Sequence, residues 1–188
     1  MKLLLTGDSI VARKEGLKEP RLNATLKKLH QNLELNNTAV SGINSGAFYA
    51  MLSELVLKQR RCDKLIILLG TNDLAQHKQV PLEQFEQNMN LIVSSVLCRY
   101  YPQNTILITP PAVDETKQIH RNNQLIGDYA AVIENVAQRY RCQFINLYQA
   151  MINQGNLSEL CRGELNDGLH FGQQGYSLLG NLIVKQIK

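Results

Sequence analysis

One serine, one histidine and one aspartate stand where they could work together. Ser9 follows Gly7-Asp8 at the end of a short apolar run, which predicts a buried strand that ends in a tight loop. Asp167 stands three residues before His170, so one turn can place both side chains on the same side. A serine hydroxyl is a weak nucleophile that needs a base in hydrogen-bond reach, and the base needs an orienting group. The pattern favours attack of Ser9 on a carbonyl carbon, with His170 as base and Asp167 as its orienter.

The attacked carbonyl would become an oxyanion, which needs hydrogen-bond donors aimed at its developing charge. The sequence offers three: the backbone N–H of Ser9, the backbone N–H of Gly42 and the side-chain amide of Asn72. Asn72 follows the apolar run at residues 65–69, and Gly42 lies in the loop after another short strand. Open parallel α/β sheets hold their active sites at the carboxyl ends of the strands. We therefore expect an oxyanion hole built from these three donors.

Five strand-like stretches alternate with amphipathic helical patterns. The run at residues 65–69 is apolar throughout, as in a central parallel strand. Such alternation implies right-handed crossovers and a parallel sheet covered on both sides. We expect an α/β fold, a flavodoxin-like three-layer α/β/α sandwich whose five-stranded parallel sheet has the order 2-1-3-4-5. The expected strands are 2–6, 38–40, 64–69, 105–109 and 142–147, and the expected helices include 21–34 and 48–59, one opening at 81, one ending near 140 and one beginning near 173.

Together these motifs resemble those of the SGNH hydrolases, the GDSL-like esterase/lipase family. The resemblance spans almost the whole chain, through Gly7-Asp8-Ser9-Ile10, Gly42, Gly70-Thr71-Asn72-Asp73 and Asp167-Gly168-Leu169-His170. It implies hydrolysis of carboxylic esters, and in some members thioesters, without metal or organic cofactor. The implied roles fall on Ser9 as nucleophile, Gly42 and Asn72 as oxyanion donors, His170 as base and Asp167 as its orienter. Asn37 also fits a common family position, where its implied role is to tie the loop.

Two positions depart from the family pattern. Val11-Ala12-Arg13 follows the first motif where many members have Thr-x-Gly, and Asn44 stands where many have threonine. Neither change touches a reacting group, so Arg13 and Asn44 are expected to affect the acyl pocket and substrate choice. The longest candidate flap, residues 112–123, is too polar to wall a fatty acyl chain. We therefore expect short acyl groups, and the sequence leaves open whether the natural substrate is an acetylated sugar, a short alkyl ester, a lysophospholipid or a thioester.

The composition is that of an ordinary globular protein, with 44% hydrophobic and 19% charged residues. The 188 residues suffice for one domain, residues 1–188, with a full core. Scattered Lys and Arg residues give a net charge of +4, so no nucleic-acid partner is expected. Neither a signal peptide nor a membrane span is expected, because the first residues lack a long apolar stretch with a cleavage site and no apolar run approaches about 20 residues. Four cysteines without close pairing favour free thiols in the cytoplasm. The oligomeric state has no sequence signal.

Two other classes of function fit parts of the sequence. Asp8 and Asp73, both expected near strand ends, could hold an ion in a phosphate- or metal-binding module of the flavodoxin or receiver type. That reading has only two acids, lacks a glycine-rich phosphate cradle and leaves Asp167 and His170 unused. A non-catalytic binding protein on a hydrolase fold is disfavoured, because every expected catalytic residue is present. No cluster of His, Cys and carboxylates around Ser9 has metal-ligand spacing, so no metal site is expected there.

Overall fold

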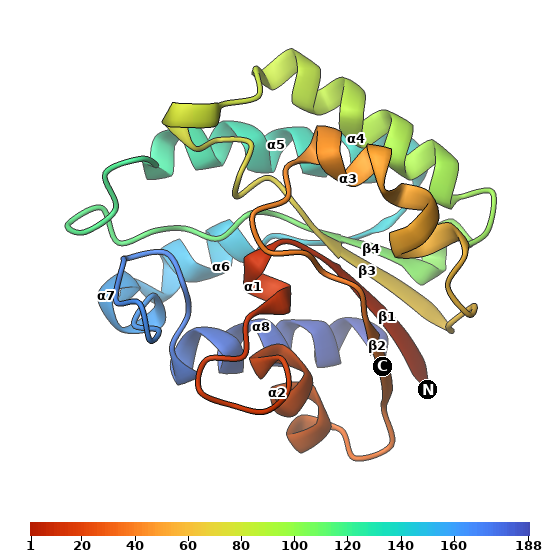
Figure 1. Cartoon of the computed structure of the whole chain (residues 1–188), viewed down its shortest axis with the longest axis horizontal. Coiled ribbons are helices and arrows are strands. Elements are labelled where there is room, and N and C mark those ends of the chain that lie inside the picture. The colour runs from red at the N-terminus through yellow and green to blue at the C-terminus, as the bar shows by residue number, and fades with distance from the viewer.

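The computed structural model describes all 188 residues. A five-stranded sheet forms its centre, in the order β2-β1-β3-β4-β5, and every neighbouring pair of strands is parallel (Figure 1). The expected strand number, direction and order are confirmed. The strands are β1 (Lys2–Gly7), β2 (Glu34–Asn37), β3 (Lys64–Leu68), β4 (Thr105–Ile108) and β5 (Gln143–Ile145).

Helices cover both faces of the sheet and give the expected three layers (Figure 1). One face carries α3 (Ser45–Ala50), the π-helical turn η1 (Ser53–Leu57), α4 (Leu82–Val96) and α5 (Asn123–Tyr140). The other carries α1 (Ser9–Ala12), α2 (Arg21–Leu29), α6 (Leu147–Gln154), α7 (Leu157–Leu160) and α8 (Gln173–Ile187). Two short 3-10 turns, η2 (Gln76–Lys78) and η3 (Pro102–Asn104), lie in connections. None of these helices has the length and apolar character needed to cross a membrane.

Alternate residues of the central strands pack into two separate cores. Leu4 of β1 and Ile67 of β3 pack with α3, α4 and α5. Leu3 and Leu5 of β1 and Ile66 of β3 pack with α2 and α8 on the opposite face. The two cores contain 25 and 23 buried residues, so both faces are filled. A sheet buried on both faces explains the continuous apolar runs of its central strands, and it gives the loops at its carboxyl ends a rigid base.

The second strand lies earlier in the chain than expected. It is Glu34–Asn37 rather than residues 38–40, and α2 correspondingly ends at Leu29 instead of residue 34. The side chains of this edge strand are exposed or only partly buried, so it carries no apolar run. Residues 38–40 continue beside β1, because the N–H groups of Thr38 and Val40 donate to carbonyls of β1 at 2.9 Å each.

The helix expected at residues 48–59 also differs. It begins at Ser45, because the Asn44 side chain caps it by accepting the N–H of Ala47 at 2.9 Å. It then breaks near Met51 and continues as η1. The loop that carries Gly42 therefore ends at Asn44, and the hydrogen bond from the Val40 N–H to the Gly7 carbonyl places the start of this loop beside the end of β1.

Candidate active site

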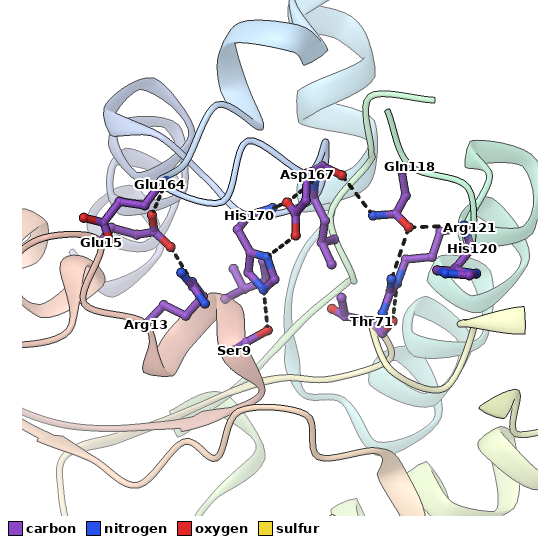
Figure 2. A network of polar contacts seen from close by, with 12 residues as sticks. Ser9, Arg13, Glu15, Thr71, Gln118, His120, Arg121, Glu164, Asp167 and His170 are labelled. Carbon is purple, nitrogen blue, oxygen red and sulfur yellow. Dashed lines mark hydrogen bonds and ion pairs between the residues drawn. The ribbon is translucent and has the colours of Figure 1, made fainter. Parts of the chain in front are cut away.

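Ser9, His170 and Asp167 form one hydrogen-bonded row at the carboxyl end of the sheet (Figure 2). His170 Nε2 lies 3.0 Å from Ser9 Oγ, and His170 Nδ1 lies 2.8 Å from Asp167 Oδ2. The fold therefore brings together side chains that stand 161 residues apart. With the carboxylate on one ring nitrogen, the other is free to accept a proton from the hydroxyl, which is the geometry that serine activation requires.

The end of β1 places Ser9 at the first position of α1. Gly7 has a φ of +143°, and a Cβ there would lie 2.1 Å from the Leu68 carbonyl oxygen on β3, so only glycine fits. Asp8 caps α1, because its Oδ1 accepts the N–H of Ile10 at 2.9 Å. The glycine and the aspartate thus shape the turn. The serine keeps a backbone N–H that has no partner within its own helix, because it opens that helix.

Asp8 directly precedes Ser9 and is fully buried. Burial raises the pKa of Asp8 to about 6, although the Thr71 hydroxyl, the Ile10 N–H and the charge of Arg121 act in the opposite direction. Asp8 Oδ2 and the Thr71 hydroxyl oxygen are both buried, and neither has a hydrogen-bond partner of normal geometry. Asp8 does not line the cavity that Ser9 lines, so it braces the turn and is not placed to meet a substrate there.

The loop before α8 holds Asp167 and His170 on the same side. Asp167 Oδ1 accepts the backbone N–H groups of Leu169 and His170 at 3.1 and 3.0 Å, while Oδ2 faces the ring. Gly168 has a φ of +73°, and a Cβ there would lie 2.6 Å from the Asp114 carbonyl oxygen. Burial tends to raise the pKa of Asp167, but the hydrogen bonds from His170 and Leu169 outweigh it and lower that pKa. The carboxylate therefore stays ionised beside the imidazole.

Gly42 and Asn72 reach the same cavity as Ser9 from the loops after β2 and β3. The Gly42 N–H donates to no protein acceptor. Gly42 has a φ of +82°, and a Cβ there would meet no atom within 4 Å, so the backbone angle requires glycine and crowding does not. Asn72 Nδ2 donates to the Ile43 carbonyl at 2.9 Å, which fixes the amide and leaves its second hydrogen for a ligand. The Gly42 N–H and one N–H of the Asn72 amide are thus free to donate hydrogen bonds in the cavity beside Ser9.

Asp73 fastens these two donor loops together. Its buried carboxylate accepts the N–H and the hydroxyl of Ser45 at 2.9 and 2.5 Å. Asn88 of α4 donates in turn to the Ser45 hydroxyl at 2.9 Å. Asn37 ties the other end of the Gly42 loop, since its amide donates to the Val11 carbonyl at 3.1 Å and its Oδ1 accepts the N–H of Ala39 at 3.1 Å. These contacts hold both donor loops in fixed positions.

Comparison with known proteins identifies the family. The sequence pattern of the GDSL-like Lipase/Acylhydrolase family matches residues 5–178. The chain belongs to this family. It is 28% identical to the isoamyl acetate-hydrolyzing esterase 1 homolog of Homo sapiens over 99% of this chain and 82% of that protein. It is 26% identical to the isoamyl acetate-hydrolyzing esterase of Saccharomyces cerevisiae over 100% of this chain and 86% of that protein.

A solved structure agrees with this assignment. The crystal structure of the lipase/acylhydrolase from Enterococcus faecalis matches with a TM-score of 0.86 and 28% identity, over 99% of this chain and 94% of that chain. The family resemblance drawn from the motifs is confirmed, and the protein is an ester hydrolase of the GDSL-like type.

The GDSL-like site opens into a cavity of about 600 Å³. Of its 14 lining residues only Ile119 and Leu169 are hydrophobic. Arg13 lines this cavity, in agreement with its expected effect on the pocket, whereas Asn44 serves as the cap of α3 and does not line it. His120 lines the cavity and His77 does not, although their rings pack edge to face at 4.9 Å. A second hollow, of about 590 Å³ beside α7 and α8, contains none of the candidate catalytic residues.

Three lining residues were not recognisable from the sequence: Lys117, Gln118 and Arg121. All three lie on the polar segment between β4 and α5. Their side chains donate to Asn166 Oδ1 and to the backbone carbonyls of Asp167 and Thr71, which stand 49 or 50 residues away, so no local spacing marks them. Only the length and polarity of this segment signalled that it could act as a flap.

The GDSL-like enzyme should keep its activity after prolonged EDTA treatment and dialysis. We expect the nucleophile, the base and the orienting group to come from the chain itself, as Ser9, His170 and Asp167, and Asp8 and Asp73 already accept hydrogen bonds from backbone N–H groups. The chain brings together no group of three or more His, Cys, Asp or Glu side chains able to hold a metal. Turnover of p-nitrophenyl acetate before and after chelation checks this prediction. Loss of turnover that Mg²⁺ or Zn²⁺ restores would favour the ion-binding reading instead.

Proposed function

We propose that this protein is a serine hydrolase of short-chain carboxylic esters and that it works through an acyl-enzyme on Ser9. The observation that carries the proposal is the row of Ser9, His170 and Asp167, in which neither hydrogen-bonded separation exceeds 3.0 Å. The partner is a small-molecule ester, and the reaction uses no cofactor.

In the first half-reaction Ser9 Oγ attacks the ester carbonyl carbon while its proton passes to His170 Nε2. The carbonyl electrons move to the oxygen, which receives hydrogen bonds from the Ser9 and Gly42 N–H groups and from the Asn72 amide. The carbon–oxygen bond to the alcohol then breaks, and the alcohol leaves with the proton from His170. Asp167 keeps the imidazole in the right tautomer and stabilises its protonated form.

In the second half-reaction a water molecule takes the place of the alcohol. His170 Nε2 accepts a proton from the water as its oxygen attacks the acyl carbon, and the same donors stabilise the second oxyanion. The bond to Ser9 Oγ breaks, the proton returns to Ser9, and the carboxylic acid leaves. Each step uses only groups that line the cavity or contact one that does.

A fluorophosphonate probe tests this proposal. One equivalent should attach to the chain, peptide mass spectrometry should locate it on Ser9, and hydrolysis of p-nitrophenyl acetate should disappear in step with labelling. An ion-binding module or a non-catalytic binding protein would show neither labelling nor hydrolysis. Full activity after labelling, or a label at another residue, would contradict an acyl-enzyme on Ser9.

Short acyl groups are favoured by the walls of the cavity. Each buried CH₂ of a substrate contributes about 0.8 kcal/mol only where an apolar wall receives it. Ile119, on the β4–α5 segment, is 79% exposed, so Leu169 is the one buried hydrophobic residue of the lining. The two relatives described above are named for hydrolysis of an acetate ester, which is consistent with a small acyl group.

We expect kcat/KM for p-nitrophenyl esters to stay flat or fall as the acyl chain lengthens from acetate to palmitate. A longer chain gains no apolar contact in this polar cavity, and it must exclude water from charged groups such as Arg13 and Lys117. The measurement is kcat/KM across the series under conditions where every ester is dissolved. A steep rise toward eight carbons and beyond would reject short-chain selectivity and point to a lipase or long-chain thioesterase.

We also propose that the protein works in the cytoplasm. Its four cysteines, Cys62, Cys98, Cys142 and Cys161, are all free, which is typical of reducing compartments. Fractionation of the source cells followed by detection with an antibody checks this proposal, and recovery of the protein outside the cytoplasmic fraction would refute it.

A further inference from the structure

The segment between β4 and α5 lies between two of the loops that carry proposed catalytic groups, the loop of Asp167 and His170 and the loop of Asn72. On one side it contacts the loop of Asp167, since the Asp114 N–H donates to the Gly168 carbonyl at 2.8 Å. On the other side it contacts the loop of Asn72, since the His120 carbonyl accepts the Gln76 N–H at 3.0 Å. The segment is therefore placed to determine how far apart the oxyanion donors and the acid–base pair lie.

Arg121 is the buried side chain through which this segment contacts the Asn72 loop. Its Nε donates to the Thr71 carbonyl at 2.8 Å, directly before Asn72, and its Nη1 lies 3.4 Å from Gln118 Oε1 (Figure 2). The residue is only 9% exposed, yet no carboxylate forms a salt bridge with it. Burial lowers the pKa of its guanidinium, and the charges of Asp8 and Asp167 oppose that shift. A buried guanidinium without an ion pair costs folding free energy, so it needs an explanation.

Gln118 completes the connection to the other loop. Its Nε2 donates to the Asp167 carbonyl at 3.2 Å, and its Oε1 accepts from Arg121 and from the His120 N–H. A continuous path of hydrogen bonds thus runs from the Thr71 carbonyl through Arg121 and Gln118 to the Asp167 carbonyl (Figure 2). Both ends of this path are backbone atoms adjacent to proposed catalytic groups.

We propose that Arg121 and Gln118 are positioning residues that hold the Asn72 loop and the Asp167–His170 loop at the separation needed for attack and oxyanion stabilisation. This inference rests on the proposed function. The rigid planar guanidinium suits the task, because it can donate to Thr71 and to Gln118 in two fixed directions at once, which a lysine ammonium on its flexible stem cannot reproduce. Neither residue needs to touch the substrate to affect the rate. We call the hydrogen-bonded pair of Arg121 and Gln118 the brace. A misplacement of a catalytic group by 1 Å can cost about 10²-fold in rate, and breaking the brace should cost a part of that.

The test begins with Arg121→Gln and Gln118→Leu, assayed with p-nitrophenyl acetate. Arg121→Gln should lower kcat by about 10- to 50-fold and change KM by less than about threefold, because ground-state binding does not depend on the brace. Arg121→Lys should recover a part of the loss, since its ammonium can still donate to the Thr71 carbonyl. Gln118→Leu should lower kcat by about tenfold. Gln118 is only half-buried, so this variant decides the question if Arg121→Gln fails to fold.

The double variant measures whether the two residues act as one unit. Because either single change interrupts the same path, Arg121→Gln with Gln118→Leu should be no slower than Arg121→Gln alone. The matched control is Arg139→Gln. It also replaces an arginine by glutamine, but at an exposed position of α5 where the arginine pairs with Glu86. It should keep the wild-type kcat.

The outcomes separate this inference from the proposed function. Hydrolysis and Ser9 labelling by the wild-type chain are measured first, and their absence would overturn the function itself. With those in place, the brace is supported if the single variants lose kcat at nearly constant KM and the double variant adds nothing. The brace is overturned if Gln118→Leu and a folded Arg121→Gln both keep kcat within about twofold of wild type. It is also overturned if the two losses multiply in the double variant, or if Arg139→Gln lowers kcat as much as Arg121→Gln does.

Discussion

Replacing Ser9 by alanine should lower kcat for p-nitrophenyl acetate by about 10³-fold or more. The change removes the one oxygen that lies in hydrogen-bond reach of His170 Nε2, at 3.0 Å, and leaves water as the only remaining nucleophile. The oxyanion donors of Gly42 and Asn72 are untouched, so slow residual turnover above the uncatalysed rate should remain. The variant should also lose all labelling by the fluorophosphonate probe.

The same loss is expected for His170→Ala, because an unassisted serine hydroxyl is a poor nucleophile. Groups that act as one unit are not additive, so the double variant should be about as slow as either single variant. This separates the triad from two independent contributions, whose losses would multiply. The measurement is kcat and KM for the three variants at one pH, with wild-type enzyme diluted to the same range of rates.

Ser158→Ala is the matched control for Ser9→Ala. Ser158 is an exposed serine on α7 and does not line the cavity at Ser9. The kcat of the Ser158→Ala variant should therefore equal that of the wild type. Circular dichroism and the melting temperature establish that each variant is folded. Near-normal turnover in a folded Ser9→Ala protein would remove the proposed triad from the mechanism, whatever the geometry of the site.

The residues proposed for the chemistry were accessible to sequence reasoning because each lies in a short loop with its own signal. Ser9 lies two residues beyond the end of β1, and Asn72 lies shortly after the end of β3. Gly7 and Gly168 mark the tight turns beside Ser9 and His170, and both have backbone angles that favour glycine. Strand ends in a parallel sheet converge at one edge, so local signals sufficed to bring these residues together.

The parts that were missed lack a local signal. β2 is partly exposed at the edge of the sheet, so Glu34-Leu35-Asn36-Asn37 shows none of the apolar pattern by which β1, β3 and β4 are recognised. Its Asn37 is retained inside the fold by side-chain hydrogen bonds to Val11 and Asn23 rather than by hydrophobic burial. Arg121 has its hydrogen-bond partner Thr71 on another loop, 50 residues away. Sequence spacing predicts contacts within a turn or a helix, and it says little about polar contacts between loops.

Replacing Asn72 by alanine is the second change for which we expect a large loss of kcat. The Asn72 amide is fixed by the hydrogen bond to the Ile43 carbonyl, next to Gly42, so its free hydrogen is held in place before the substrate arrives. A donor fixed in advance is most effective on the charge that develops in the transition state, because no reorganisation is needed at that moment. Asn72→Ala should therefore lower kcat by about 10²- to 10³-fold and change KM far less.

The same substitution has a structural cost that the assay must separate from the catalytic one. Removing the amide leaves the Ile43 carbonyl without this donor, which should lower the free energy of unfolding by about 1–3 kcal/mol if water does not replace it. Asn153→Ala, at an exposed asparagine of α6, is the matched control and should leave kcat unchanged. Kinetics at 25 °C, well below the melting temperature of every variant, then report on chemistry alone. A loss confined to KM would show that Asn72 binds the ester in its ground state, and the oxyanion hole would have to be assigned to the backbone donors of Ser9 and Gly42.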